Sequence, residues 1–413
     1  MQRRPAKKPR LAPDLRGHLR PPDETRVARG KAVPITPSVL EWALSESGYE
    51  ADALARAIGV APDVVRAWVK GDDQPNITAL RALATELKRP LAAFLLPHPP
   101  KVPKPAIEFR APGGSGRADL NVAERHRIRE AVRLQRMLAW ITRELGRAPA
   151  TVPRETIKAS AETRARETRT RLDVTVEQQR KWRSASAALQ GWRRALERTG
   201  VFVFTLPMGE ESARGFSLWD EQAPLIALNT SWNAEARIFT LFHEYAHLLT
   251  RTSSACVEAV NRLPTGKSDP TERWCEQFAA DVIIPRQALE EYLTTQGVRR
   301  PVTDLKTIGR IAHHFRASLR TTTLRLISLK AASWPLYRSL PAHAERKPAG
   351  GGGAGRNRAQ IRVEQYGLHT ANVFSTALEK DLVNRADVLD YLDMPPHALG
   401  RTSAADDPAF ERD

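Results

Sequence analysis

A short motif with two histidines and a glutamate lies inside a strongly apolar segment of this sequence: His243-Glu244-Tyr245-Ala246-His247. The periodicity of the segment predicts a helix that is apolar on its other faces and therefore buried. Burial removes hydration from polar side chains, so the two histidines and the glutamate need hydrogen-bond partners or a metal ion. The apolar positions are Ile238, Phe239, Leu241, Phe242, Ala246, Leu248 and Leu249.

The spacing of the motif suits one bound Zn²⁺. Residues four apart lie on one face of a helix, so the imidazoles of His243 and His247 would converge on a single ion. Glu244 is turned about 100° from His243, which lets it reach a water molecule at the ion without becoming a ligand. We therefore interpret the histidines as metal ligands and Glu244 as the general base of a zinc peptidase. The alternative is that all three are hydrogen-bonded core residues.

A catalytic zinc ion usually takes three protein ligands and leaves its fourth position for water. The sequence has no second His-x-x-x-His pair, and the adjacent His313 and His314 would point apart on a helix. An acidic residue downstream is therefore the expected third ligand. Glu272 and Glu276, four apart on one predicted helix face, are both candidates on spacing alone.

Two longer tracts carry a family resemblance. The first is Phe239-Thr240-Leu241-x-His243-Glu244-x-x-His247-Leu248-Leu249, and the second is Glu272-x-x-Cys275-Glu276-x-Phe278-Ala279-Ala280-x-x-Ile283-Ile284-Pro285. Together they resemble the ImmA/IrrE family of metallopeptidases, whose second motif is Glu-x-x-Ala/Cys-Asn/Asp-x-Phe-Ala. The resemblance selects Glu272 as the third ligand. Glu276 replaces the family's Asn or Asp and stays an alternative ligand, while Cys275 is expected in the core.

The resemblance also implies a fold, a cofactor and a substrate. It implies a gluzincin-like domain with strands beside the motif helix, Zn²⁺ as cofactor with Mn²⁺ as a substitute, and XRE-type repressors as substrates. Cleavage of such a repressor would release phage, mobile-element or stress-response genes. The strand at residues 224–229 would offer its edge to the substrate backbone. Three strands are predicted, over Val201–Phe204, Gly215–Leu218 and Leu225–Leu228.

A helix-turn-helix pattern precedes the peptidase region. The order Leu54-Ala55-x-x-x-Gly59-Val60-x-x-x-x-Val65-x-x-Trp68 resembles the XRE-like family, within a predicted five-helix bundle. The resemblance implies that the helix from Pro62 to Val69 would enter the DNA major groove, and Asp63, Arg66 and Lys70 remain as candidate contacts. Polar residues expected at the starts of two helices are replaced by Ala51 and Ala61, so protein docking is the alternative role.

Charge and cysteine content indicate which partners and which cellular compartment to expect. The chain has 64 Lys and Arg against 47 Asp and Glu, which favours nucleic acid or acidic partners. Much of the excess lies in the first 31 residues and in the arginine run from 164 to 171, which we interpret as tails and linkers. Two cysteines make no disulfide framework, and no segment approaches the roughly 20 apolar residues of a membrane helix. We expect a cytoplasmic protein with no membrane partner.

Cys256 lies nine residues after His247 in a predicted Ser/Thr-rich loop. We expect an ordinary loop cysteine there. The alternative is a fourth, inhibitory zinc ligand, if the loop folds back over the site.

The predicted fold class is mainly α with an α+β catalytic core. Long helices are predicted over Leu120–Leu145 and Val176–Thr199. The expected regions are a disordered basic arm (1–34), a helix-turn-helix domain (35–97), a Pro/Gly-rich connector (98–118), a zinc peptidase domain (119–334), a Gly-rich linker (335–360) and a small C-terminal helical region (361–413).

A second hypothesis is a DNA-binding transcription regulator, or a toxin-antitoxin-like partner, with a structural or sensory zinc site. The helix-turn-helix pattern and the basic charge favour it. Glu244 argues against it, because a structural zinc site needs no general base and prefers four protein ligands.

Overall fold

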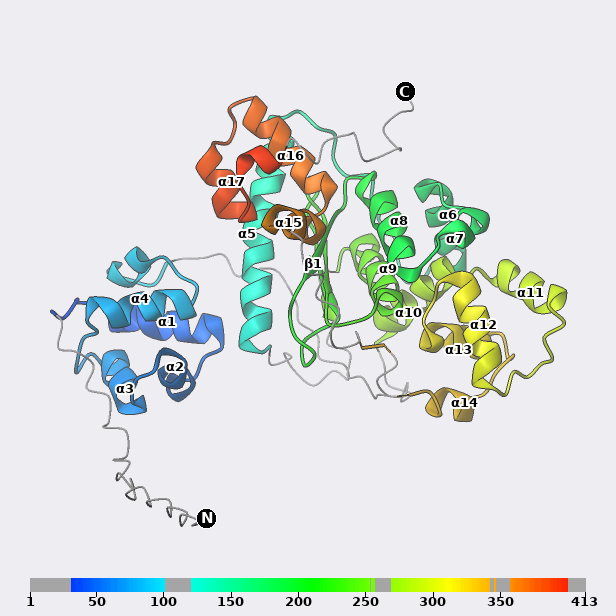
Figure 1. Ribbon diagram of the computed structural model, residues 1–413, viewed down its shortest axis with the longest axis horizontal. Helices are drawn as coiled ribbons and strands as arrows, with labels where there is room; N and C mark the ends of the chain where they lie inside the picture. The colour runs from blue at the N-terminus through cyan, green and yellow to red at the C-terminus, as the bar shows by residue number, and fades with distance from the viewer. Residues whose placement is uncertain are drawn as a thin grey trace, which may run out of the picture. The chain divides into compact units, whose positions relative to one another are not determined.

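The computed structural model describes residues 31–100, 120–252, 254–256, 269–341, 345–346 and 357–399. The chain divides into two compact units, Met1–Val102 and Pro103–Asp413, which we call the N-terminal and C-terminal units (Figure 1). Most of the predicted basic arm, most of the connector and residues 347–356 of the predicted linker lie outside the described residues. No helix in the described ranges is both long enough and apolar enough to span a bilayer.

The N-terminal unit is a small helical bundle around one apolar core. Gly59 has a φ of 74°, a left-handed conformation that suits glycine, and it ends the second helix so that the third can turn away. The side chain of Asn76 accepts a hydrogen bond from the Ala79 amide and so caps the start of the fourth helix. The elements are α1 (Pro37–Ser47), α2 (Ala51–Ile58), α3 (Pro62–Lys70), α4 (Ile77–Glu86) and a 3₁₀ helix, η1 (Leu91–Leu95).

A mixed four-stranded sheet forms the centre of the C-terminal unit, in the order β1-β3-β2-β4. The strands are β1 (Phe202–Leu206), β2 (Gly215–Leu218), β3 (Leu225–Asn229) and β4 (Ser254–Cys256). The three predicted strands are therefore confirmed, and a short fourth strand joins them. β3 pairs in parallel with β1 and antiparallel with β2.

The expectation that residues 224–229 offer a free edge is wrong. β3 lies inside the sheet, so its backbone hydrogen-bonding groups are used by both neighbouring strands. An apolar run predicts a strand but not its lateral position, because that position depends on pairing with distant segments.

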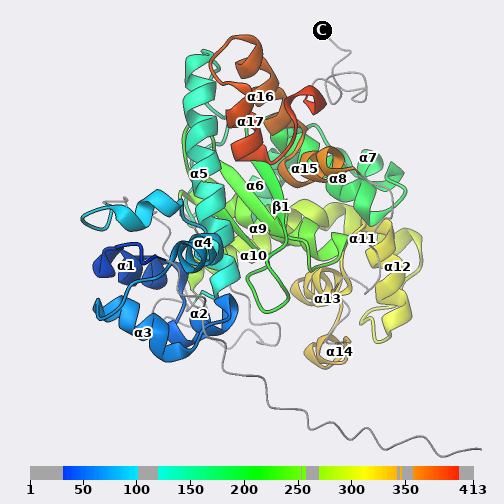
Figure 2. The same cartoon turned by 60° about the vertical axis from the view of Figure 1, so that its left-hand side comes forward.

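Helices cover both faces of the sheet, as Figures 1 and 2 show. Along β1, Val203 faces a core with α8 (Ala185–Glu197), α9 (Ala234–Thr250) and α10 (Pro270–Ile283). Its neighbours Phe202 and Phe204 face a second core, formed with α5 (Val122–Glu144) and the C-terminal helices. This alternation follows from the two-residue period of a strand that is buried on both faces.

The C-terminal helices complete the second core and have no separate core of their own. Tyr366, Phe374 and Val388 are buried in the same cluster as Phe204 and Phe216. The helices are α15 (Arg358–Tyr366), α16 (Leu368–Glu379) and α17 (Arg385–Leu392), followed by the 3₁₀ helix η2 (Pro396–Ala398). The predicted fold class, mainly α with an α+β core, is confirmed.

The long helix predicted over Val176–Thr199 is wrong in one respect, because it is broken into α7 (Val176–Lys181) and α8. Ser184 caps the start of α8 by accepting a hydrogen bond from the Ala187 amide. At the break Trp182 packs edge-on against Trp192, with ring centroids 5.2 Å apart. Gly191 leaves room for this, since a Cβ atom there would lie 2.3 Å from the Trp182 ring.

The arginine run from 164 to 171, interpreted above as tail or linker, is instead part of α6 (Ala161–Leu172). Ala165 and Leu172 are buried, and so is Arg169, which donates hydrogen bonds of 2.7 Å to Gln179 and to the Val282 carbonyl. The apolar residues of this helix are few and small and lie among many charged ones, so their helical spacing is hard to recognise in the sequence. The remaining helices are α11 (Arg286–Thr295), α12 (Leu305–Phe315), α13 (Leu319–Ser328) and α14 (Trp334–Arg338).

Candidate metal centre

Helices α9 and α10 bring two histidines and one glutamate together. The Nε2 atoms of His243 and His247 lie 3.2 Å apart. Glu272 places Oε2 3.2 Å from His243 Nε2 and Oε1 3.5 Å from His247 Nε2. Within the described part of the chain, this is the group of His, Cys, Asp or Glu side chains that could hold a metal ion.

The donor set fits a divalent metal ion such as Zn²⁺. Bonds of about 2.0–2.1 Å in a tetrahedral arrangement place neighbouring ligand atoms about 3.3 Å apart. The separations of 3.2 Å and 3.5 Å between the imidazole and carboxylate atoms are close to that spacing. His247 Nδ1 lies 2.9 Å from the Thr252 hydroxyl, and donation from Nδ1 leaves the Nε2 lone pair for a metal.

The local charges favour a cation at the same point. Burial lowers the pKa of His243, but the hydrogen bond and the charge of Glu272 outweigh burial and raise it to about 9. Burial raises the pKa of Glu272, but its hydrogen bonds with His243 and His247 hold it well below the usual range of a carboxyl. Glu272 therefore supplies a negative charge next to both imidazole rings.

The two acidic candidates for third ligand are separated by the structure. Glu272 lies in the first turn of α10 and reaches both histidines. Glu276 lies one turn later, is exposed, and is not part of the three-residue cluster. The position of Glu272 agrees with what the family resemblance implies.

Glu244 lies beside the cluster without joining it. Its side chain is fully buried, and Oε2 accepts a hydrogen bond of 2.8 Å from the Ser217 hydroxyl on β2. A carboxylate next to a metal site that is not itself a ligand can accept and return protons. This is the position that the motif predicts for a general base.

Sequence reasoning missed two residues that contact the motif, Ser217 and Thr252. Ser217 lies in a strand that is otherwise glycine and apolar residues, Gly-Phe-Ser-Leu, and this contrast is a signal for it. Cys275 is buried, as expected, with Sγ 3.8 Å from His247 Nδ1. The backbone of Cys256 pairs with Gly215 in the sheet, so the predicted loop is a strand there, while its side chain lies outside the described residues.

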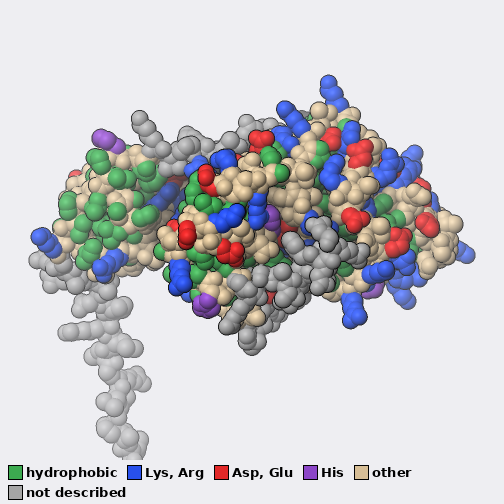
Figure 3. Space-filling model, turned by 90° about the horizontal axis from the view of Figure 1, so that it is seen from above, with side chains coloured by type: hydrophobic (Ala, Val, Ile, Leu, Met, Phe, Trp, Pro, Cys, Tyr) green, Lys and Arg blue, Asp and Glu red, His purple; other side chains and the backbone are tan. Residues whose placement is uncertain are grey.

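The three candidate DNA contacts lie on the exposed face of α3. Arg66, the central one, donates a hydrogen bond of 2.6 Å to Asp63 and another to Asp52. Residues 31–100 contain seven Lys and Arg against eight Asp and Glu, so the basic excess of the chain lies elsewhere. On the face seen in Figure 3, Lys and Arg side chains gather on the C-terminal unit and are few on the described part of the N-terminal unit.

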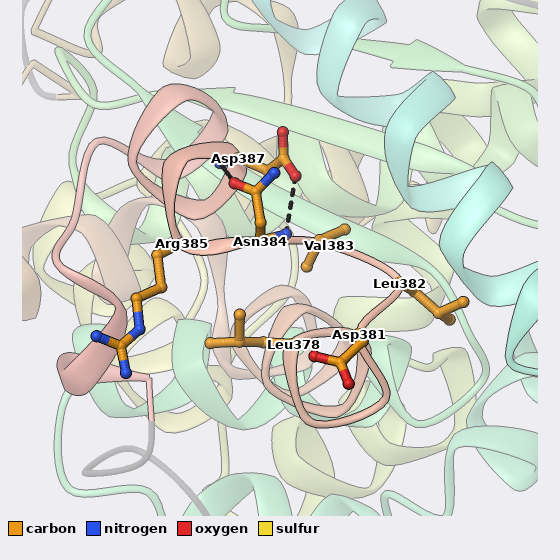
Figure 4. A pocket seen from close by; sticks show the side chains of 7 residues that line it. All are labelled: Leu378, Asp381, Leu382, Val383, Asn384, Arg385 and Asp387. Atoms are coloured by element: carbon orange, nitrogen blue, oxygen red, sulfur yellow. Dashed lines mark hydrogen bonds between the residues drawn. The ribbon is translucent and has the colours of Figure 1, made fainter.

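Two surface hollows lie away from the cluster. One, of about 450 Å³, lies at the turn between α16 and α17, where Asn384 and Asp387 form the capping box of α17 (Figure 4). The other, of about 280 Å³, is lined by the capping residues Ser184, Asn233 and Ser318. Neither is lined by a residue of the cluster, and the candidate site is located by its side-chain chemistry.

Comparison with protein families agrees with this location. Residues 196–326 match the model of the IrrE N-terminal-like domain, Peptidase_M78. The matched segment contains the whole sheet, α9 and α10, and therefore His243, Glu244, His247 and Glu272. The match supports a metallopeptidase of the ImmA/IrrE type in this part of the chain. No curated protein matches the chain.

Proposed function

We propose that the chain is a zinc-dependent endopeptidase that cleaves an XRE-type repressor at one site and so derepresses the genes under its control. The observation that carries the proposal is the grouping of His243, His247 and Glu272 around one point, with Glu244 beside it. The family match over residues 196–326 supports the peptidase class. The repressor as substrate follows from the family resemblance alone.

In the proposed reaction His243, His247 and Glu272 hold the metal ion. Zn²⁺, or Mn²⁺ in its place, would supply Lewis acidity, polarising the scissile carbonyl and lowering the pKa of a water molecule. Glu244 takes the proton of the attacking water as the new C–O bond forms. It then delivers that proton to the leaving amine as the C–N bond breaks, so that one acid and one amine result.

The surroundings of Glu244 suit the role of a general base. Its side chain is fully buried, so no bulk water competes for its oxygens. The Ser217 hydroxyl, fixed on the sheet, holds one of these oxygens. A positioned carboxylate of this kind contributes a rate factor of about 10² to 10⁴.

The second candidate, a DNA-binding regulator with a structural zinc site, receives less support. Three protein ligands and an adjacent non-ligand carboxylate are typical of a catalytic site, whereas structural sites usually have four ligands. Residues 31–100 also lack the basic excess of most DNA readers. We therefore infer that this unit serves protein docking.

The proposal is tested with the purified chain, Zn²⁺ or Mn²⁺, and a small XRE-type repressor encoded beside this gene. The expected result is a single cut in the repressor that depends on the metal. Glu272→Gln should lose both metal and cleavage. Glu276→Gln, the same substitution one turn along α10, should keep both. A repressor that stays intact with fully metallated protein would overturn the proposed substrate.

A further inference from the structure

We propose that Ser217 is a positioning residue for the general base, holding the Glu244 carboxylate in the orientation that the reaction requires. The inference rests on the proposed function and adds a residue outside the motif. Its basis is the 2.8 Å hydrogen bond from Ser217 Oγ to Glu244 Oε2, between two side chains that are both fully buried.

β2 presents two different faces. Phe216 and Leu218 point into the apolar core shared with α5 and the C-terminal helices. Gly215 and Ser217 alternate with them and face α9, where a Cβ at Gly215 would lie 3.6 Å from Glu244 Cγ. The small and polar residues of this strand are therefore the ones that meet the general base.

A serine at a fully buried strand position needs a hydrogen-bond partner. Burying an unpaired hydroxyl is unfavourable, and an apolar residue would avoid that cost. Ser217 instead uses its single donor on the Glu244 carboxylate. A hydrogen bond to a charged acceptor is roughly twice as strong as a neutral one. Packing alone would be satisfied by an apolar residue at position 217, so the serine indicates a role for its hydrogen bond to Glu244.

The backbone under Ser217 is held on both sides. Ser217 pairs with Ile226 of β3 and with Ser254 of β4, so the hydroxyl projects from a strand inside the sheet. A donor fixed in this way restricts the rotation of the longer Glu244 side chain. Loss of the donor would leave Glu244 in place but spread over several orientations.

The test is the rate of repressor cleavage by the full chain loaded with Zn²⁺. Ser217→Ala should lower kcat by about 10- to 100-fold, because misplacing a catalytic group by about 1 Å can cost about 10²-fold in rate. KM and zinc content should stay unchanged, because neither substrate contacts nor metal ligands are altered. Ser217→Thr, which keeps the hydroxyl, should recover most of the rate.

A matched control separates positioning from general stability. Ser212 is a second buried serine, and its hydroxyl donates to the Met208 carbonyl and contacts no residue of the metal centre. Ser212→Ala should leave kcat unchanged. If Ser217→Ala is unstable, Ser217→Cys fills the site with a slightly larger side chain that is only a weak donor, and it should also lower kcat.

A double-mutant cycle gives the deciding readout. Glu244→Asp shortens the carboxylate out of reach of Ser217, so adding Ser217→Ala to it should cost little further activity. An equal loss in both backgrounds, or wild-type kcat in Ser217→Ala, would overturn the positioning role. Failure of the wild-type chain to cut any repressor would instead contradict the proposed function, so the two failures are distinguishable.

Discussion

Gly215 on β2 and Thr240 on α9 approach so closely that a Cβ atom at Gly215 would lie 2.6 Å from Thr240 Cγ2. The same atom would lie 2.7 Å from the carbonyl oxygen of Ala227 on β3. Only glycine therefore fits between the sheet and the motif helix at this point. This contact sets the distance at which β2 meets the side chain of Glu244.

Substituting Gly215 by alanine should destabilise the C-terminal unit. Overpacking of this kind costs about 1–3 kcal/mol, because backbone and side chains must shift to admit the methyl group. Chemical denaturation of the purified variants measures the free energy of unfolding. Gly309→Ala, on α12, is the matched control. A Cβ atom at Gly309 would meet no neighbouring atom within 4 Å, so this substitution should be neutral or stabilising. Equal stability of Gly215→Ala and wild type would show that the contact is not tight.

Stability should fall as the pH drops from about 6.5 to about 4, in part because of His369. Burial, aided by the charge of Arg147, lowers the pKa of His369 to about 4. An unfolded histidine titrates near pH 6.5, so within this window the unfolded state binds a proton that the folded state does not. The stability contribution is therefore present above pH 6.5 and lost as the pH falls.

His369→Phe removes this titrating group and can retain the ring contact with Phe202, whose centroid lies 4.5 Å from that of His369. Unfolding free energies at pH 6.5 and pH 4.5 give the readout for both proteins. The difference between the two pH values should be smaller in the variant than in the wild type. The same difference in both would contradict the assignment.

DNA binding by the full chain should not depend on α3. Arg66 is already paired with Asp52 and Asp63, and the described N-terminal unit has no basic excess. The double variant Arg66→Ala/Lys70→Ala should therefore show the same DNA affinity and the same salt dependence as the wild type in a mobility-shift titration. Loss of sequence preference, with a shallower salt slope, would instead make this helix a DNA reader.

Local spacing predicted which side chains come together in the candidate metal centre. The offset between His243 and His247 places both on one helix face whatever surrounds the helix, and the family resemblance placed Glu272 on the next one. Ser217 could not be predicted, because its contact with Glu244 depends on the order of the strands. The buried side of α6 was missed for a related reason, since arginines surround its small apolar residues.

In the proposed mechanism Glu244 is a base that acts at a metal ion it does not bind. Metal analysis and repressor cleavage are measured together on wild type, Glu244→Gln and His247→Ala. We predict one zinc ion per chain in the wild type and in Glu244→Gln, and its loss in His247→Ala. Cleavage should be abolished in both variants. A Glu244→Gln protein that holds stoichiometric zinc and cuts the repressor at the wild-type rate would contradict the account.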